Sequence, residues 1–169
     1  MTHTCATAIS DFATGKLSEV RLPSGCALAE ATRAIDRLAT ARDMVGNLGT
    51  EQVQVRWRAI DVGVAGARLL LWHDSEHVLA LELESPRPAG GWPALHATLG
   101  APDAKLAYWN DVVEAKDGMW IYAQRGLAVY TSLADTELVR AVLFAPTTVD
   151  GYQARLARSL APPRELELP

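Results

Sequence analysis

The sequence predicts an α+β protein built of two related modules, each a helix packed on an antiparallel sheet. The main observation is a strand pattern that occurs once in each half of the chain, at Gly66–Pro86 and at Gly126–Pro146. Each copy holds a glycine, an apolar run, a short polar turn, a second apolar run and a closing proline, and the two align without a gap. A segment of helical character precedes each copy, at Ala27–Arg42 and at Trp92–Leu99. Short strands separated by polar turns indicate an antiparallel meander in each half.

The first module is expected to span residues 16–86. Met1–Gly15, which precedes it, is rich in Thr and Ala without clear periodicity, and we expect it to form an arm. Apolar residues recur at helical spacing within Ala27–Arg42, with Ser24 as the expected cap and a break at Gly46–Gly49. The strands expected in this module are Lys16–Leu22, Gln52–Ile60, Arg68–Trp72 and Val78–Ser85, of which the second alternates most strictly between apolar and polar residues.

The second module is expected to span residues 91–160, after a boundary rich in proline and glycine at Pro86–Gly91. It begins with the helix Trp92–Leu99, in which Pro93 is tolerated in the first turn. Apolar residues at helical spacing from Val149 onward predict a C-terminal helix. The strands expected in this module are Lys105–Trp109, Met119–Ala123, Leu127–Ser132 and Leu138–Ala145.

Composition and charge narrow the class of protein. Of the 169 residues, 49% are hydrophobic and 21% are charged, which is typical of a soluble globular chain with a sizeable core. The formal net charge of -4 and the absence of a basic stripe argue against nucleic acid as a partner. No run approaches the roughly 20 apolar residues of a membrane-spanning helix, so we expect no membrane partner.

The two cysteines, Cys5 and Cys26, are too few for a disulfide framework, and no CxxC motif is present. Cys5 falls in the expected arm, so a reducing compartment is the simplest interpretation. The N-terminal residues contain neither a basic region nor a long apolar region and do not read as a signal peptide. We therefore expect a cytoplasmic location.

Residues 92–146 resemble a known small fold. The helix ends in Leu99-Gly100-Ala101-Pro102, and a meander with aromatic residues follows at Trp120-Ile121-Tyr122, Leu127–Tyr130 and Ala141–Phe144. This pattern resembles the fold of the β-lactamase inhibitory proteins and of small outer-membrane-assembly lipoproteins, which is also seen in bacterial toxin-immunity proteins. The inhibitory proteins are tandem duplications of such a unit. The resemblance implies a protein-binding protein without catalytic residues, although Asn47–Thr50 in the first half lacks the corresponding proline.

One segment of the second module combines aromatic and acidic residues in the manner of a protein interface. Tyr108 and Trp109 precede Asp111, Glu114 and Asp117 in a short stretch. Trp and Tyr are over-represented as anchors of protein interfaces. We expect these five residues to bind a partner protein, a toxin or an enzyme with a basic surface, and the competing interpretation is a solvated loop.

A second cluster, His73-Asp74-Ser75-Glu76-His77, offers a metal-binding alternative. If the segment is a hairpin turn, His73 and His77 face each other and could share a zinc or nickel ion. The alternative function is then a metal-dependent hydrolase or a metal-binding protein, whereas the plainer interpretation is a polar turn with two exposed histidines. No HExxH, GxSxG or P-loop motif is present, so we expect no enzyme activity, no catalytic residues and no cofactor. A third possibility is a structural component of an envelope or secretion assembly.

Overall fold

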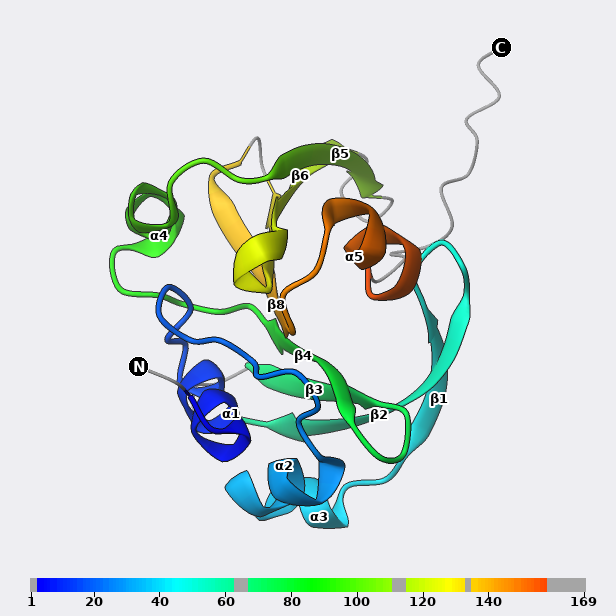
Figure 1. Cartoon of the computed structure of the whole chain (residues 1–169). Coiled ribbons are helices and arrows are strands. Elements are labelled where there is room, and N and C mark those ends of the chain that lie inside the picture. Colours follow the sequence, from blue (N-terminus) through cyan, green and yellow to red (C-terminus); the bar gives the residue numbers. More distant parts are fainter. Residues whose placement is uncertain (1–2, 63–66, 111–114, 133–134, 158–169) are drawn as a thin grey trace.

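Figure 1 shows the computed structural model of the chain. It describes residues 3–62, 67–110, 115–132 and 135–157, with the backbone alone at 107–110 and 115–117. Within these residues, eight strands form one antiparallel sheet and five α-helices lie against it. The predicted α+β class with an antiparallel sheet is confirmed.

The sheet joins two meanders through their last strands. Its strand order is β1-β2-β3-β4-β8-β7-β6-β5, and every pair of neighbours in it is antiparallel. Within each meander, neighbouring strands are consecutive in the chain. Among the described strands, the two meanders are therefore paired with each other only through β4 and β8. The strands are β1 (Met44–Leu48), β2 (Val53–Asp61), β3 (Arg68–His73), β4 (Val78–Glu84), β5 (Ala104–Asn110), β6 (Ala115–Tyr122), β7 (Leu127–Ser132) and β8 (Glu137–Phe144).

Helices cover both faces of the sheet. One face buries a core with side chains from the first four helices, among them Phe12, Ala31, Leu38 and Leu95. The other face is covered by the last helix, whose Tyr152 is fully buried. None of the helices within the described residues is long and apolar enough to span a membrane. The helices are α1 (Cys5–Ala13), α2 (Leu28–Ala34), α3 (Arg37–Thr40), α4 (Gly91–Leu99) and α5 (Val149–Arg155), with a short 3-10 helix η1 (Ala123–Arg125) before β7.

Strands with strict alternation lie where the sequence predicts them. In β2, Val55 is buried on the face that α5 covers, and Val53, Trp57 and Ala59 pack against the same core. The strand begins one residue after the predicted start, because Gln52 has a φ of 54° and belongs to the preceding turn. Strands β3, β4, β7 and β8 also match their predicted ranges to within two residues.

The predicted N-terminal arm is wrong, because most of it is helix α1. The Thr4 side chain caps this helix by accepting a hydrogen bond from the Thr7 N–H at 3.2 Å. Ala8, Ile9 and Phe12 lie on one side of it and are fully buried. The buried residues Cys5, Ala8, Ile9 and Phe12 follow the helical spacing i, i+3, i+4, i+7, but only Ile9 and Phe12 are large apolar residues, so the amphipathic period is short and weak.

The predicted strand Lys16–Leu22 is also wrong, since the structure assigns this segment no regular structure. Its apolar side chains are nevertheless buried: Leu17, Val20 and Leu22 all belong to the core beneath α1. The Arg125 guanidinium donates a hydrogen bond to the Ser18 carbonyl and so holds the segment to the second half of the chain. The spacing of Leu17, Val20 and Leu22 therefore reflects packing beneath a helix rather than the period of a strand.

The single helix predicted at Ala27–Arg42 is two helices, α2 and α3, interrupted at Ile35, whose φ of -137° is extended. The expected cap at Ser24 is wrong as well. The Val78 N–H donates to the Cys26 carbonyl and Ala27 forms a β-bridge with His77, so α2 begins only at Leu28. Pairing with β4 therefore determines where this helix begins.

Gly46 lies inside strand β1, where the sequence predicts a break. A Cβ at this position would meet Trp72 at 3.3 Å and Trp57 at 3.4 Å. The glycine therefore makes room for two indole rings, which themselves pack with centroids 5.8 Å apart. The expected break marks close packing rather than the end of a strand.

Cys5 and Cys26 form a disulfide bond, with Cα atoms 5.4 Å apart. Both side chains are buried, and the bond joins the first turn of α1 to the residue that pairs with β4. The sequence does not predict this bond, because it places Cys5 in an arm, whereas Cys5 belongs to a packed helix.

An ion pair between a half-buried arginine and a fully buried glutamate lies where the meanders meet. The Arg140 Nε atom of β8 lies 2.6 Å from a carboxylate oxygen of Glu82 on β4, and the Glu82 side chain is 1% exposed. The same guanidinium lies over the Tyr130 ring, 5.5 Å from its centroid. The Tyr130 hydroxyl is in turn 2.7 Å from that of Tyr152, whose pKa is raised well above its usual range by burial. A chain of polar contacts thus crosses from β4 to α5.

We expect the disulfide to contribute about 2–4 kcal/mol to the free energy of unfolding, because it closes a loop with a sequence separation of 21 residues. Urea unfolding of the wild type with and without reductant measures this difference. The double variant Cys5→Ser/Cys26→Ser is the control, and its midpoint should not respond to reductant. Equal midpoints for the wild type in both conditions would contradict the prediction.

Replacement of Arg140 by methionine should lower the free energy of unfolding by about 3–5 kcal/mol, because it takes the counter-charge from a carboxylate that has left water. Arg68→Met is the matched control: its pair with Glu84 is more exposed, and its loss should cost about 1 kcal/mol or less. The double variant Glu82→Leu/Arg140→Met should recover most of the loss. Urea unfolding curves of the four proteins decide, and an equal effect of Arg140→Met and Arg68→Met would be evidence against the buried pair.

Candidate binding site

Three of the predicted interface residues, Tyr108, Trp109 and Asp117, belong to the paired strands β5 and β6 at the outer edge of the described sheet. Tyr108 lies opposite Asp117 in the strand register, and Trp109 lies opposite Lys116 on the next rung. The side chains of Tyr108, Trp109 and Asp117 are outside the described part of the structure, as are Asp111 and Glu114 entirely. The backbone thus brings an aromatic and an acidic residue of the predicted set to paired positions.

Three rings pack together at the base of this hairpin. Trp92 and His96 of α4 stack with centroids 5.1 Å apart, and Trp120 of β6 contacts both, at 5.1 Å from Trp92 and 4.9 Å from His96. Trp92 is buried, whereas Trp120 is half-buried. The His96 Nδ1 atom lies 3.4 Å from the Tyr122 hydroxyl. These contacts hold helix α4 against strand β6 of the hairpin.

An ion pair covers the outer ring of this group. The Lys105 Nζ atom lies 4.2 Å from the centroid of Trp120 and 2.6 Å from a carboxylate oxygen of Asp135. Thr131 donates to the other Asp135 oxygen at 2.6 Å and accepts from the Trp120 indole N–H at 3.1 Å. We call Trp92, His96, Trp120, Lys105 and Asp135 the hairpin-base cluster.

The absence of a side chain at Gly118 leaves the space in which Asp135 and Trp120 pack together. A Cβ on Gly118 would collide with the Asp135 carboxylate and would lie 2.9 Å from both the Thr131 hydroxyl and the Trp120 indole nitrogen. A glycine inside a strand that another group approaches closely is a recognised use of this residue. Asp135 itself has a φ of 66°, and its carboxylate lies beside Thr131 and Gly118 of the sheet.

The charge on Asp135 is held by its neighbours. Burial acts to raise the pKa of this carboxyl, but hydrogen bonds from Lys105 and Thr131 outweigh burial, so the pKa lies below its usual value. The cluster therefore presents a fixed carboxylate and a fixed ammonium beside a half-exposed indole. Such an arrangement can orient a binding surface, because charges held in place lose little freedom when a partner binds.

His73 lies in a different environment from the one the sequence suggests. Its side chain is 1% exposed, with the Nε2 atom 2.9 Å from an oxygen of Asp43. The Ser75 N–H donates to its Nδ1 atom at 3.0 Å, so the proton resides on Nε2 and is donated to Asp43. Arg58 also donates to Asp43, at 2.6 Å, and to the Leu38 carbonyl. His73 and Arg58 thus hold Asp43, the residue before β1, to the sheet, and Arg58 also holds α3 to it.

The two histidines of the predicted metal site do not face each other. A register shift after Trp72 pairs His73 with Val78, and the His77 side chain is 48% exposed beside Asp74. The interpretation of both histidines as exposed turn residues is wrong for His73. In the described part of the chain, no group of three or more His, Cys, Asp or Glu residues is placed to hold a metal ion. Asp43, the true neighbour of His73, is 30 residues away in the sequence and could not be found from local spacing.

Comparison with known proteins gives no relative for this chain: no family model, no curated protein and no solved structure matches it. The candidate site therefore depends on the geometry of the chain itself.

The hydrogen bonds around Asp43 predict a pH-dependent effect on stability. The hydrogen bond from Arg58 is the largest influence on the pKa of Asp43 and, with that from His73, holds it below its usual value against the opposing effect of burial. A carboxyl whose pKa is lowered in the folded state stabilises that state above its unfolded pKa of about 3.9, and this contribution is lost as the pH falls through the folded pKa.

Asp43→Asn should therefore lower the free energy of unfolding near neutral pH by about 1–3 kcal/mol, and the difference from wild type should shrink below about pH 4. Asp61→Asn, an exposed change at the end of β2, is the control and should have little effect. Urea unfolding of the three proteins between acidic and neutral pH measures this dependence. A difference for Asp43→Asn that stays constant over the whole pH range would contradict the role assigned to the carboxylate.

Proposed function

We propose that this protein acts by stoichiometric binding of another protein, as an immunity or inhibitor protein that neutralises a bacterial toxin or enzyme, without enzyme activity of its own. The observation that carries the proposal is the β5–β6 hairpin. It lies at the edge of the described sheet, its paired positions hold Tyr108 and Asp117, and the hairpin-base cluster anchors its lower end.

The rigidity of the hairpin base supports this proposal. A binding surface gains affinity when its backbone is ordered before the partner arrives. Trp92 and His96 pack against Trp120, and the Lys105–Asp135 ion pair holds β5 to the turn that precedes β8. Aromatic and acidic residues just above such a base have the composition of an anchor with a charged rim. With the net charge of -4, they favour a partner whose surface is basic.

We further propose that the two halves are related modules, as in a tandem inhibitor. The strand order supports this relation. In each half, four strands lie side by side in chain order, with the first strand at an outer edge of the sheet and the last strand at its centre. In each half, helical structure precedes the meander in the chain. Two copies joined through their last strands form one wide sheet, and a wide sheet offers more surface to a partner than either copy alone.

The cytoplasmic location stays a prediction, and the structure weakens one of the two arguments for it. It rests in part on the inference of a reducing compartment from two cysteines without a disulfide framework. The Cys5–Cys26 bond does not support that inference, because disulfides persist mainly in oxidising compartments.

The test is capture of the partner from the native host with the full chain as bait. We expect one secreted or toxic protein at a one-to-one ratio. Trp109→Ala and Asp111→Arg should each weaken its binding by about 1–2 kcal/mol or more in calorimetry, since removal of a buried interface tryptophan has at least this effect. A partner that is instead a component of an envelope or secretion assembly would favour the structural alternative.

Charge reversal offers a matched control. Glu114→Arg should weaken binding and slow association, whereas Glu51→Arg, the same change in the exposed β1–β2 turn, should leave both unchanged. If both variants weaken binding equally, the effect is one of net charge and the proposed site is wrong. Unaltered binding after replacement of residues 108–117 would also exclude the hairpin.

A further inference from the structure

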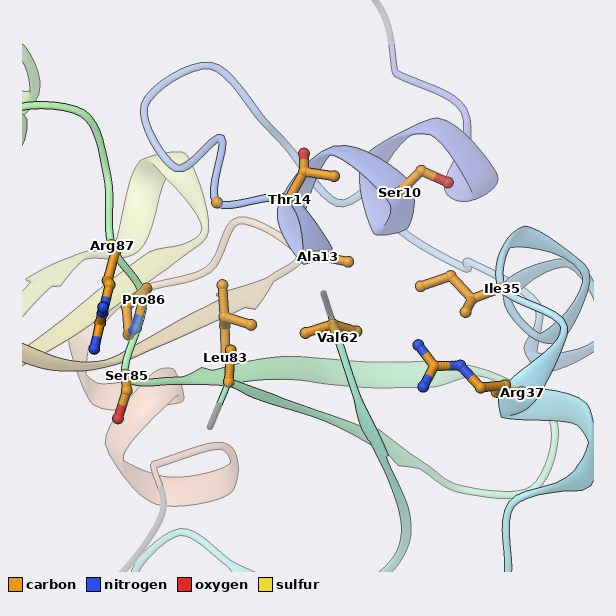
Figure 2. Close-up of a pocket in the computed structure, with 12 residues that line it drawn as sticks. Ser10, Ala13, Thr14, Ile35, Arg37, Val62, Leu83, Ser85, Pro86 and Arg87 are labelled. Carbon is orange, nitrogen blue, oxygen red and sulfur yellow. The ribbon is translucent and has the colours of Figure 1, made fainter. Parts of the chain in front are cut away.

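A cavity lies between the end of α1 and the sheet, and Figure 2 shows the side chains around it. Its volume is about 480 Å³, within the range of roughly 300–1,000 Å³ found for small-molecule sites. Ala13 of α1, Ile35, Val62 and Leu83 of β4 come from four separate parts of the chain and surround the space. The cavity is on the face opposite α5 and far in sequence from the hairpin.

The walls of the cavity are aliphatic. Val62 and Leu83 are buried at its base, and Pro86 closes one side. Hydroxyl groups occur only toward the rim, on exposed residues such as Thr14 and Ser85. Among the described residues that line the cavity, none is aromatic and none is acidic. A bound molecule would therefore contact mainly aliphatic side chains. These described residues offer no ring on which it could stack and no carboxylate that would repel a negative charge.

The charged groups of the lining are two arginines at opposite ends. Figure 2 shows the Arg37 side chain extending from the start of α3 toward Val62, whereas Arg87 runs past Pro86 at the other end. Neither guanidinium forms an ion pair with a carboxylate in the described part of the chain. A guanidinium that points toward an apolar space without a counter-charge is suited to an anion at the end of an apolar body.

We propose that the cavity binds an aliphatic carboxylate, with its hydrocarbon chain against Ile35, Val62 and Leu83 and its carboxylate on Arg37. The guanidinium fork donates two parallel hydrogen bonds to a carboxylate, and the aliphatic walls take the chain out of water. This binding is independent of the protein partner, because no residue of the hairpin-base cluster lines the cavity.

Calorimetric titration of the full chain with octanoate tests the proposal, with octanol as the neutral probe of the same length. We expect saturable binding of octanoate, about three- to tenfold weaker for octanol and for octanoate with Arg37→Gln. Arg33→Gln is the matched control, because Arg33 is exposed on α2 and does not line the cavity, and it should bind octanoate as the wild type does.

A second variant, Ala13→Phe, fills the space from a half-exposed position and should abolish binding of both probes. Circular dichroism checks its fold, and if it does not fold, the Arg37→Gln result decides alone. The proposal is overturned if octanoate shows no saturable binding, if octanol binds as tightly as octanoate, or if Arg37→Gln binds octanoate unchanged. Normal binding by a folded Ala13→Phe would place the ligand elsewhere and overturn it too.

Discussion

The antiparallel pairing of β4 with β8 is the contact on which the rest of the structure depends. It is the one ladder through which the meanders β1–β4 and β5–β8 are joined among the described strands. Leu81 and Leu83 of β4 pair with Leu143 and Ala141 of β8 and are buried in the core beneath the first four helices. Without this pairing, each meander would leave the backbone N–H and C=O groups of β4 or β8 unpaired along a sheet edge, and the core that both halves share would be open.

Within this apolar contact, the buried pair of Glu82 and Arg140 is the costly element. Apolar residues of the same size could pack there with equal or greater stability, so the pair is better explained by specificity than by stability. Glu82 lies opposite Val142 and Glu84 opposite Arg140, so the ion pair is a diagonal contact on one face of the sheet. A one-residue shift of register between β4 and β8 would turn one of the two charged side chains to the other face and separate them. Tyr130 and Tyr152 extend the same polar contacts to α5, and we infer that they fix how this helix lies on the sheet. The register in turn sets where β5 and β6 stand, and with them the proposed binding hairpin.

The sequence predicts well what depends on local period and poorly what depends on distant partners. Strand β2 alternates, and its apolar side faces the core as predicted, because a strand with one buried face must alternate. Helix α1 escapes detection because its buried stripe is short and only Ile9 and Phe12 in it are large apolar residues. The beginning of α2 depends on a bridge to His77. In the candidate site, composition indicates the hairpin, but the Lys105–Asp135 pair joins residues 30 positions apart and no local motif predicts it.

Native-state hydrogen exchange in low urea tests the central claim most directly, because it measures the opening free energy of each strand separately. If the β4–β8 contact joins the two halves into one structure, the amides of both strands should exchange only through global unfolding. Their opening free energy should then equal the free energy of unfolding from urea curves, and β1 and β5 at the edges should open more easily. Exchange of β4 and β8 at a lower free energy than β6 and β7 would mean that the halves separate while still folded, and would contradict the account.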